Sequence, residues 1–248
     1  MHVRAIAIIP ARYASTRLPG KALASLDGRP MIRHVAERTC QARTVAQVIV
    51  ATDDERIASA VAGSGAEVAM TRPDHPTGTD RLAEVAARLD ADVVVNVQGD
   101  LPLLDPSMVD RLVERMERDP TLPMATLAAP IHDEEEWRSP HVVKVVCDAH
   151  QRALYFSRSP VPHHRDGVRA GVPLGWRHIG MYAYRRAVLL ELAALAPTPL
   201  ETSERLEQLR ALEHGIGVES WTAAEPVIEV DVVEDLERAR AALSGQTA

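Results

Sequence analysis

The chain has 248 residues, enough for one large domain or for a domain with a sizeable insertion, and its hydrophobic (46%) and charged (25%) contents are those of a globular protein. A formal net charge of −7 argues against a general nucleic-acid binder, and no apolar run is long enough to span a bilayer. The two cysteines, Cys40 and Cys147, have no metal-ligand spacing. We therefore expect a cytoplasmic protein that binds a small anionic ligand and neither nucleic acid nor a membrane.

Apolar strands alternate with helical patterns through the first half of the chain. The expected strands cover residues 3–9, 47–52, 67–71 and 92–97, and the expected helices cover residues 30–41, 54–63, 81–89 and 106–118. The helix over 81–89 continues from a start expected within the loop over 72–80. Asp53 is expected to cap the helix over 54–63. This alternation is typical of an α/β protein with a doubly wound, mainly parallel sheet of the Rossmann-like kind.

The pattern changes from about residue 124. Strands are expected over residues 124–130, 142–148, 153–157, 180–184, 218–221 and 227–230, a loop over 159–173, and helices over 185–195, 199–214 and 234–243. We expect a single domain over 1–248. Its core would comprise residues 1–123 and about 181–248, and a smaller mixed α/β region would cover about 124–180.

A basic loop follows the first strand. It contains Arg12, Arg17 and Lys21, and Lys21 is one of only two lysines in the chain. Open α/β sheets bind ligands at the carboxyl ends of their strands, and a compact ammonium in such a loop suits a phosphate group. The alternative is an ordinary surface loop with solvated charges.

Two aspartates stand at similar positions farther along the chain. Asp100 follows the valine-rich strand, and Asp231 precedes the last helix. Each alone is more typical of a helix cap or a turn, but together with Lys21 they favour Mg²⁺ bridging to phosphate oxygens. The chain has neither a Walker P-loop nor a Gly-x-Gly-x-x-Gly fingerprint after the first strand. We therefore expect group transfer by positioning and charge, without a redox cofactor.

These residues lie in segments that resemble, in order, the motifs of the 3-deoxy-manno-octulosonate cytidylyltransferases, also called CMP-Kdo synthetases. The first is the opening loop, Ile-Ile-Pro-Ala-Arg-Tyr-Ala-Ser-Thr-Arg-Leu-Pro-Gly-Lys over residues 8–21. The others cover residues 50–53, 70–72, 77–79, 95–100, 124–127, 143–146, 153–158, 177–182 and 206–210.

The resemblance implies a Mg²⁺-dependent cytidylyltransferase that acts on CTP and a small acidic acceptor and forms a homodimer through about residues 124–180. The implied catalytic residues are Arg12, Lys21, Asp100 and Asp231, of which Asp100 and Asp231 would hold Mg²⁺. CTP would be bound by Ala11, Arg12, Lys21, Arg72, Thr77, Gly78, Thr79 and Gln98. The acceptor would be bound by Arg17, Gln98, Arg158, His178, Tyr182, Glu207 and Gln208. The acceptor hydroxyl, activated on Mg²⁺, would attack the α-phosphorus in line and release pyrophosphate.

Two departures from the family pattern lie close to these residues. Leu101 stands where the family usually has Glu, and Val232 stands where it usually has Thr. The expected acceptor is a Kdo-type sugar acid, as in lipopolysaccharide biosynthesis. One alternative is phosphonoformate, the acceptor of relatives that serve phosphonate natural-product biosynthesis. The other alternative is a non-catalytic homologue that only binds nucleotide.

Overall fold

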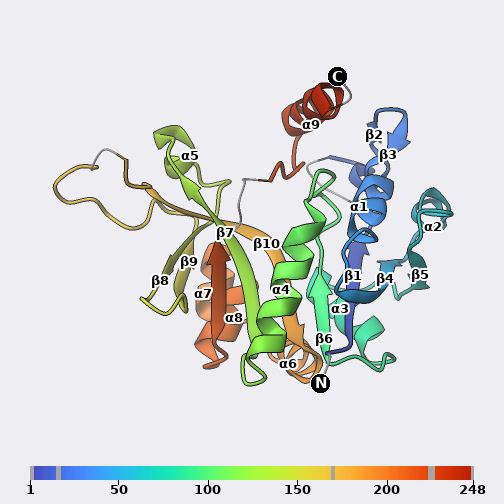
Figure 1. Ribbon diagram of the computed structural model, residues 1–248, viewed down its shortest axis with the longest axis horizontal. Coiled ribbons are helices and arrows are strands. Elements are labelled where there is room, and N and C mark those ends of the chain that lie inside the picture. Colours follow the sequence, from blue (N-terminus) through green and yellow to red (C-terminus); the bar gives the residue numbers. More distant parts are fainter. Residues whose placement is uncertain (1–2, 15–17, 169–170, 223–226, 247–248) are drawn as a thin grey trace.

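The protein is built on one large mixed sheet (Figure 1). The computed structural model describes residues 3–14, 18–168, 171–222 and 227–246. Among these residues the main sheet comprises β1 (Ala5–Ala11), β4 (Val45–Thr52), β5 (Glu67–Met70), β6 (Val93–Asn96), β7 (Met124–Ile131), β8 (Lys144–Cys147), β9 (Ala153–Ser157), β10 (Gly175–Arg185) and β11 (Val218–Thr222). Seven strands follow the order β11-β7-β10-β6-β1-β4-β5, and β8 and β9 extend the sheet from β10.

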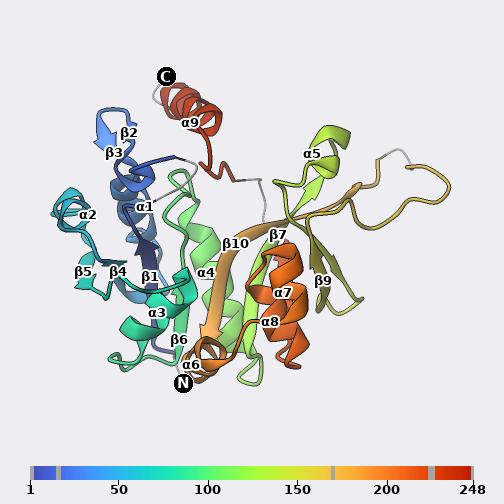
Figure 2. The same cartoon turned by 180° about the vertical axis from the view of Figure 1, so that it is seen from behind.

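Helices cover both faces of this sheet, as the two opposite views show (Figures 1 and 2). They are α1 (Met31–Thr39), α2 (Glu55–Ala60), α3 (Gly78–Ala86), α4 (Pro106–Arg118), α5 (Glu134–Arg138), α6 (Arg186–Ala194), α7 (Pro199–Glu204), α8 (Gln208–Glu213) and α9 (Val233–Gln246). A short 3-10 turn, η1 (Lys21–Leu23), and a hairpin of β2 (Ser25–Leu26) and β3 (Arg29–Pro30) follow the basic loop. None of the described helices is long and apolar enough to cross a membrane.

The central strand β1 explains why the sheet is covered on both sides. Its side chains alternate, so Ala5, Ala7 and Ile9 pack into the core formed with α1 and α4. Ile6 and Ile8 pack into the opposite core, formed with α3 and α6. All five residues are essentially inaccessible to solvent. A strand that is apolar on both faces belongs inside a doubly wound sheet, which confirms the predicted fold class.

The parallel part of the sheet brings strand ends together. β1 pairs in parallel with β4 and β6, and β4 pairs in parallel with β5. The carboxyl ends of these strands therefore lie along one edge. The basic loop leaves this edge after Ala11, and Asp100 lies just beyond the end of β6.

The other half of the sheet is mixed because β10 runs antiparallel to β6 and β7. The ladder between β10 and β7 is interrupted between Ile179 and Tyr182, which leaves Gly180 and Met181 without a partner on β7. An interruption of two residues keeps the side-chain alternation, so His178 and Tyr182 stay on one face. The hydroxyl of Thr126 donates to the carbonyl of Met181 at 2.8 Å and stabilises the bulge.

The carboxyl-terminal segment packs across the edge where the basic loop lies (Figure 1). Val230, Leu236 and Ala239 form a small apolar cluster with Leu26 and Met31. The backbone N–H of Val230 donates to the carbonyl of Asp100 at 3.0 Å. These contacts bring Asp231 beside Asp100.

The structure corrects three predictions. Residues 227–230 form no strand; their segment packs against the Asp100 turn without a ladder. The helix expected over 199–214 is divided into α7 and α8 because Arg205 adopts a left-handed conformation (φ 54°).

The cap of α2 is Asp54, which accepts from the N–H of Arg56, whereas Asp53 pairs with Arg81 at 3.1 Å. Helix α3 begins at Gly78, within the stretch 72–80 where a helix start was expected, after a capping box formed by Thr77 and Asp80.

Candidate active site

Two cavities adjoin at the carboxyl edge of β1 and β6. The nucleotide cavity, as we name it, has a volume of about 390 Å³ and is lined by residues of the basic loop and the start of α3. The acceptor cavity has a volume of about 330 Å³ and is lined mainly by residues of β10, of the segment 204–210 and of the segment 141–143. Both are lined by Gly78, Gln98, Asp100, Glu207 and Asp231. These five residues therefore mark where the two cavities adjoin.

Lys21 lines the nucleotide cavity and lies between the predicted metal ligands, which line both cavities. Its Nζ is 2.8 Å from Oδ2 of Asp100 and 3.0 Å from Oδ1 of Asp231. Burial lowers the pKa of Lys21, but the two carboxylates outweigh this effect and raise the pKa above its ordinary value. Lys21 is therefore a cation at neutral pH. The turn that positions it needs Gly20, whose φ of 69° is left-handed.

The turn that carries Gln98 and Asp100 packs tightly against β1. A Cβ atom at Gly99 would lie 3.2 Å from the carbonyl oxygen of Pro10. Glycine therefore permits the close approach that places Asp100 within reach of Lys21.

The predicted CTP-binding residues fall into two groups. Those that line a cavity are Ala11, Arg12, Lys21, Thr77, Gly78, Thr79 and Gln98. Arg72 lines neither; its side chain is 67% exposed and lies near Asp74 and Glu84. His75 and Arg81, which were not predicted, do line the nucleotide cavity.

The guanidinium of Arg12 is exposed at the nucleotide cavity, and within the described part of the chain it has no ion pair. The neighbouring Tyr13 is fixed by Arg56, whose guanidinium carbon lies over its ring, 3.4 Å from the centroid. Arg56 is held in turn by Asp54, at 2.6 Å. This stack orients the start of the basic loop while Arg12 stays available for an anion.

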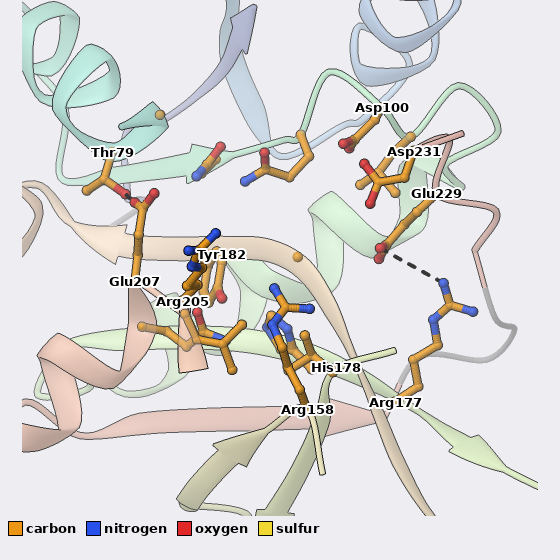
Figure 3. A pocket seen from close by; sticks show the side chains of 18 of the residues that line it. Thr79, Asp100, Arg158, Arg177, His178, Tyr182, Arg205, Glu207, Glu229 and Asp231 are labelled. Carbon is orange, nitrogen blue, oxygen red and sulfur yellow. Dashed lines mark hydrogen bonds and ion pairs between the residues drawn. The ribbon is translucent and has the colours of Figure 1, made fainter. Parts of the chain in front are cut away.

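The predicted acceptor residues gather around the second cavity (Figure 3). Those that line it are Gln98, Arg158, His178, Tyr182, Glu207 and Gln208. Arg17, also predicted to contact the acceptor, lies outside the described residues.

His178 is buried at the floor of the acceptor cavity. Burial, together with the neighbouring Arg177, lowers the pKa of His178 to about 3. Its ring is therefore neutral, with Nε2 3.0 Å from the hydroxyl of Thr126. The ring also packs edge-on against Phe156, with centroids 5.0 Å apart. His178 can thus offer a hydrogen bond but not a positive charge.

Glu207 connects the two halves of the site. The hydroxyl of Thr79, in the first turn of α3, donates to Oε2 of Glu207 at 2.5 Å. Burial raises the pKa of Glu207, although this hydrogen bond acts in the opposite direction. The Glu207 carboxylate can therefore contact a ligand in either cavity.

The acceptor cavity contains residues that the sequence analysis missed, among them Arg177, Arg205 and Glu229. A guanidinium nitrogen of Arg177 lies 3.9 Å from Oε2 of Glu229 (Figure 3). Another nitrogen of the same guanidinium donates to Glu136 at 3.2 Å. Glu229 could have been found from its spacing, because residues two apart in an extended segment share a face and Asp231 was already predicted. Burial and the nearby Asp100 and Asp231 raise the pKa of Glu229 to about 7, although Arg177 acts in the opposite direction.

The chemistry of Asp100 and Asp231 fits a hard divalent cation. Both carboxylates already face one positive charge, the Lys21 ammonium. The described residues contain no cluster of three or more His, Cys, Asp or Glu side chains that could hold a metal by themselves. Mg²⁺ needs no such cluster, since one or two carboxylates with substrate phosphates and water complete its shell.

The structure shows what Leu101 and Val232, the two departures from the family pattern, do in this chain. Leu101 is fully buried and packs in the core formed with α4, so this position contributes to the core. Val232 is 39% exposed. The N-terminus of α9 is satisfied without a hydroxyl at 232, because the carboxylate of Asp235 accepts from the N–H groups of Asp231 at 2.9 Å and Val232 at 3.1 Å.

Comparisons with known proteins agree with this geometry. A family model described as "Cytidylyltransferase" matches residues 6–221. The chain is 52% identical over 240 residues to a 3-deoxy-manno-octulosonate cytidylyltransferase of Geobacter sulfurreducens, covering 94% of this chain and 96% of the relative. It is 54% identical over 242 residues to the protein of the same name from Pelobacter propionicus, covering 94% of this chain and 95% of the relative.

Solved structures show the same likeness. CMP:2-keto-3-deoxy-manno-octonic acid synthetase complexed with CTP superposes with a TM-score of 0.91 at 44% identity, covering 98% of this chain and 99% of that one. A 4-diphosphocytidyl-2C-methyl-D-erythritol synthase from Anaerococcus prevotii superposes with a TM-score of 0.65 at 14% identity, covering 98% of this chain and all of the other, which indicates a shared fold only.

Proposed function

This chain belongs to the family of 3-deoxy-manno-octulosonate cytidylyltransferases, which are nucleotidyltransferases, and we propose that it transfers CMP from CTP to Kdo. The observation that carries the proposal is the position of Lys21, Asp100 and Asp231 where the two cavities meet. Cations for a triphosphate lie on one side of this border, and a pocket with several arginines for an acid lies on the other. The reacting phosphorus would lie between them.

The nucleotide cavity is suited to CTP. Arg12 and Lys21 bind the triphosphate oxygens and stabilise the charge that develops as pyrophosphate leaves. Ala11 and the turn from Thr77 to Thr79 bind the cytidine. Arg72 was predicted to join them, but its side chain lies outside the nucleotide cavity.

The acceptor cavity is suited to a sugar acid. Arg158 attracts the carboxylate, and Tyr182, Glu207 and Gln208 bind hydroxyl groups. Neutral His178 contributes a hydrogen bond without adding charge. Arg17 would join the acceptor from the basic loop. The acceptor oxygen then forms a bond to the α-phosphorus in line with the bond that breaks to pyrophosphate, and its proton leaves to solvent.

Asp100 and Asp231 would hold Mg²⁺, which neutralises phosphate charge and lowers the pKa of the acceptor hydroxyl when bound. The chain's own contribution is to keep the two carboxylates at the border between the substrates. Lys21 must then exchange at least part of its contact with the carboxylates for the phosphates.

A homodimer is the proposed assembly, through the smaller region of about residues 124–180. Four of the large apolar side chains that this monomer exposes lie there: Leu154 (62%), Val168 (50%), Val172 (52%) and Trp176 (36%). A contact between two copies through this region would remove these apolar side chains from water. Sedimentation of the purified protein tests this, and a monomer at micromolar concentration contradicts it.

Pyrophosphate release from CTP tests the activity. We expect release with Kdo that requires Mg²⁺ and stops when the metal is chelated. Release with phosphonoformate but not with Kdo contradicts the proposed acceptor and favours the phosphonate alternative. No release with any acid, together with retained CTP binding, favours a non-catalytic homologue.

A further inference from the structure

Lys144, on β8, is the second of the two lysines and is completely buried. Its Nζ donates to three backbone carbonyls: Ser139 at 2.8 Å, Val142 at 2.6 Å and Arg158 at 2.6 Å. An ammonium has three N–H donors, so all of them are used. Among the described residues, no carboxylate forms an ion pair with it.

The three carbonyls belong to two separate segments beside the acceptor cavity. Ser139 and Val142 belong to the loop that follows α5, and this loop contributes His141, Val142 and Val143 to the cavity wall. Arg158 follows β9 and lines the same cavity. Lys144 therefore ties together two parts of that wall.

The same loop also contacts the guanidinium of Arg158. One of its nitrogens, Nη1, donates to the carbonyl of Pro140 at 3.0 Å, and Pro140 lies between the two loop carbonyls that Lys144 binds. Its Nε donates to the carbonyl of Glu204 at 2.8 Å. The orientation of Arg158 thus depends on a loop that Lys144 fixes.

Lys144 also adds charge to the wall. Burial and the neighbouring Arg158 lower the pKa of Lys144 to about 8, while Glu204 acts in the opposite direction. At neutral pH most of the protein therefore carries this ammonium. Lys144 and Arg158 are adjacent cations, and the Glu204 carboxylate beside them offsets one of the two charges, so this side of the cavity keeps a net positive charge that attracts an acid.

We propose that Lys144 is a positioning residue for the acidic acceptor: its buried ammonium holds the loop over residues 139–142 against residue 158 and so aims the Arg158 guanidinium into the acceptor cavity. The inference rests on the proposed function, since it assumes that an acid binds there. It adds a residue that touches no substrate but controls how tightly the acidic acceptor binds.

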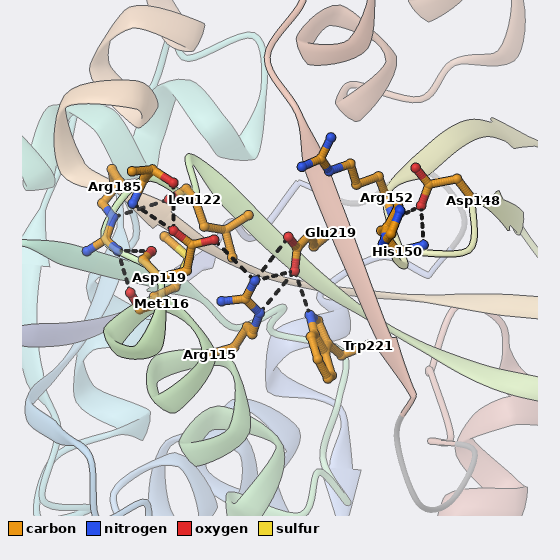
Figure 4. A network of polar contacts seen from close by, with 11 residues as sticks. Arg115, Met116, Asp119, Leu122, Asp148, His150, Arg152, Arg185, Glu219 and Trp221 are labelled. Carbon is orange, nitrogen blue, oxygen red and sulfur yellow. Dashed lines mark hydrogen bonds and ion pairs between the residues drawn. The ribbon is translucent and has the colours of Figure 1, made fainter.

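The test compares Lys144→Met with a matched control, Arg185→Met. Arg185 is also a cation that binds backbone carbonyls, those of Met116, Asp119 and Leu122 near the end of α4 (Figure 4). It lines neither cavity. Each substitution removes a charge and leaves carbonyls unpaired, so both variants lose stability. Lys144→Gln, which retains two donors, serves as a milder variant should Lys144→Met fail to fold.

Steady-state KM values for Kdo and for CTP are measured for each variant, with thermal unfolding as the check of folding. We expect Lys144→Met to raise the KM for Kdo by roughly tenfold or more, with Lys144→Gln between it and the native protein, while the KM for CTP stays unchanged. Arg185→Met should change neither KM. Combining Lys144→Met with Arg158→Met should add little to the effect of Arg158→Met alone, because the two residues act in series.

Equal changes in both KM values, or additive effects in the double variant, would overturn the inference. So would Lys144 variants that lose stability and retain the native KM for Kdo. These outcomes differ from failure of the proposed function, in which the native protein itself does not release pyrophosphate with Kdo.

Discussion

The ammonium of Lys21 lies 2.8 Å from the carboxylate of Asp100, the residue that would bind Mg²⁺. Asp231 binds the same ammonium from the other side, at 3.0 Å. A cation from the chain therefore stands where a divalent cation is expected. The lysine and the metal compete for one pair of carboxylates unless phosphate oxygens draw the lysine away.

Replacement of Lys21 by methionine should strengthen metal binding to the protein without nucleotide. The substitution removes the positive charge that contacts both Asp100 and Asp231 and competes with a metal ion for them. We expect the affinity for Mn²⁺, used as a spectroscopic substitute for Mg²⁺, to rise by roughly fivefold, since one close charge interaction in a partly exposed site is worth about 1 kcal/mol. Electron paramagnetic resonance titration measures free Mn²⁺ directly. Weaker binding in the variant would mean that Lys21 helps to form the metal site.

Lys21→Ala should reduce turnover far more than it reduces folding stability. Loss of a group that stabilises developing charge typically costs about 10² to 10³ in rate. The ion pairs that it removes are partly exposed, so the free energy of unfolding should fall by only about 1 kcal/mol. Urea unfolding and pyrophosphate release are compared on the same preparation. Proportionate losses of rate and stability would indicate a structural loop.

Arg12 and Arg158 should separate the two substrates kinetically. Arg12 lines only the nucleotide cavity, and Arg158 lines only the acceptor cavity. We expect Arg12→Met to raise the KM for CTP and Arg158→Met to raise the KM for the acid, each by roughly tenfold, because each loses one charge-assisted contact. Each variant is the control for the other. A shared effect on both KM values would contradict the division into two cavities.

His178 should make the folded state less stable in mild acid. Its pKa lies near 3 in the folded protein and near 6.5 when exposed. Between these values the unfolded chain binds a proton that the folded protein does not, so stability is full above pH 6.5 and falls as the pH decreases. The slope that this residue contributes is about 1.4 kcal/mol per pH unit. Urea unfolding of the native protein and of His178→Gln at pH 7 and pH 5 measures it. A pH dependence of equal size in the variant would assign the effect to other groups.

Much of the fold could be predicted because its signals are local. The 106–118 helix has the same bounds in the structure, with Asp105 capping it and Pro106 at its first position. The apolar runs at β1, β4 and β6 also lie where they were expected. The failures came where tertiary contacts decide, as at residues 227–230, whose apolar side chains pack in a loop, and at Arg205, whose left-handed backbone divides a helical pattern.

The sequence by itself determined the alternating strands and helices of the core, the identities of Lys21, Asp100 and Asp231, and their positions at element ends. It did so because side-chain periodicity and turn residues act within a few positions along the chain. Only the tertiary structure decided that Lys21 binds both aspartates, that Glu229 and Arg177 enter the acceptor cavity, and that Lys144 connects two segments of its wall. Such contacts depend on the order of strands in the sheet and on the packing of distant segments, which no local pattern encodes.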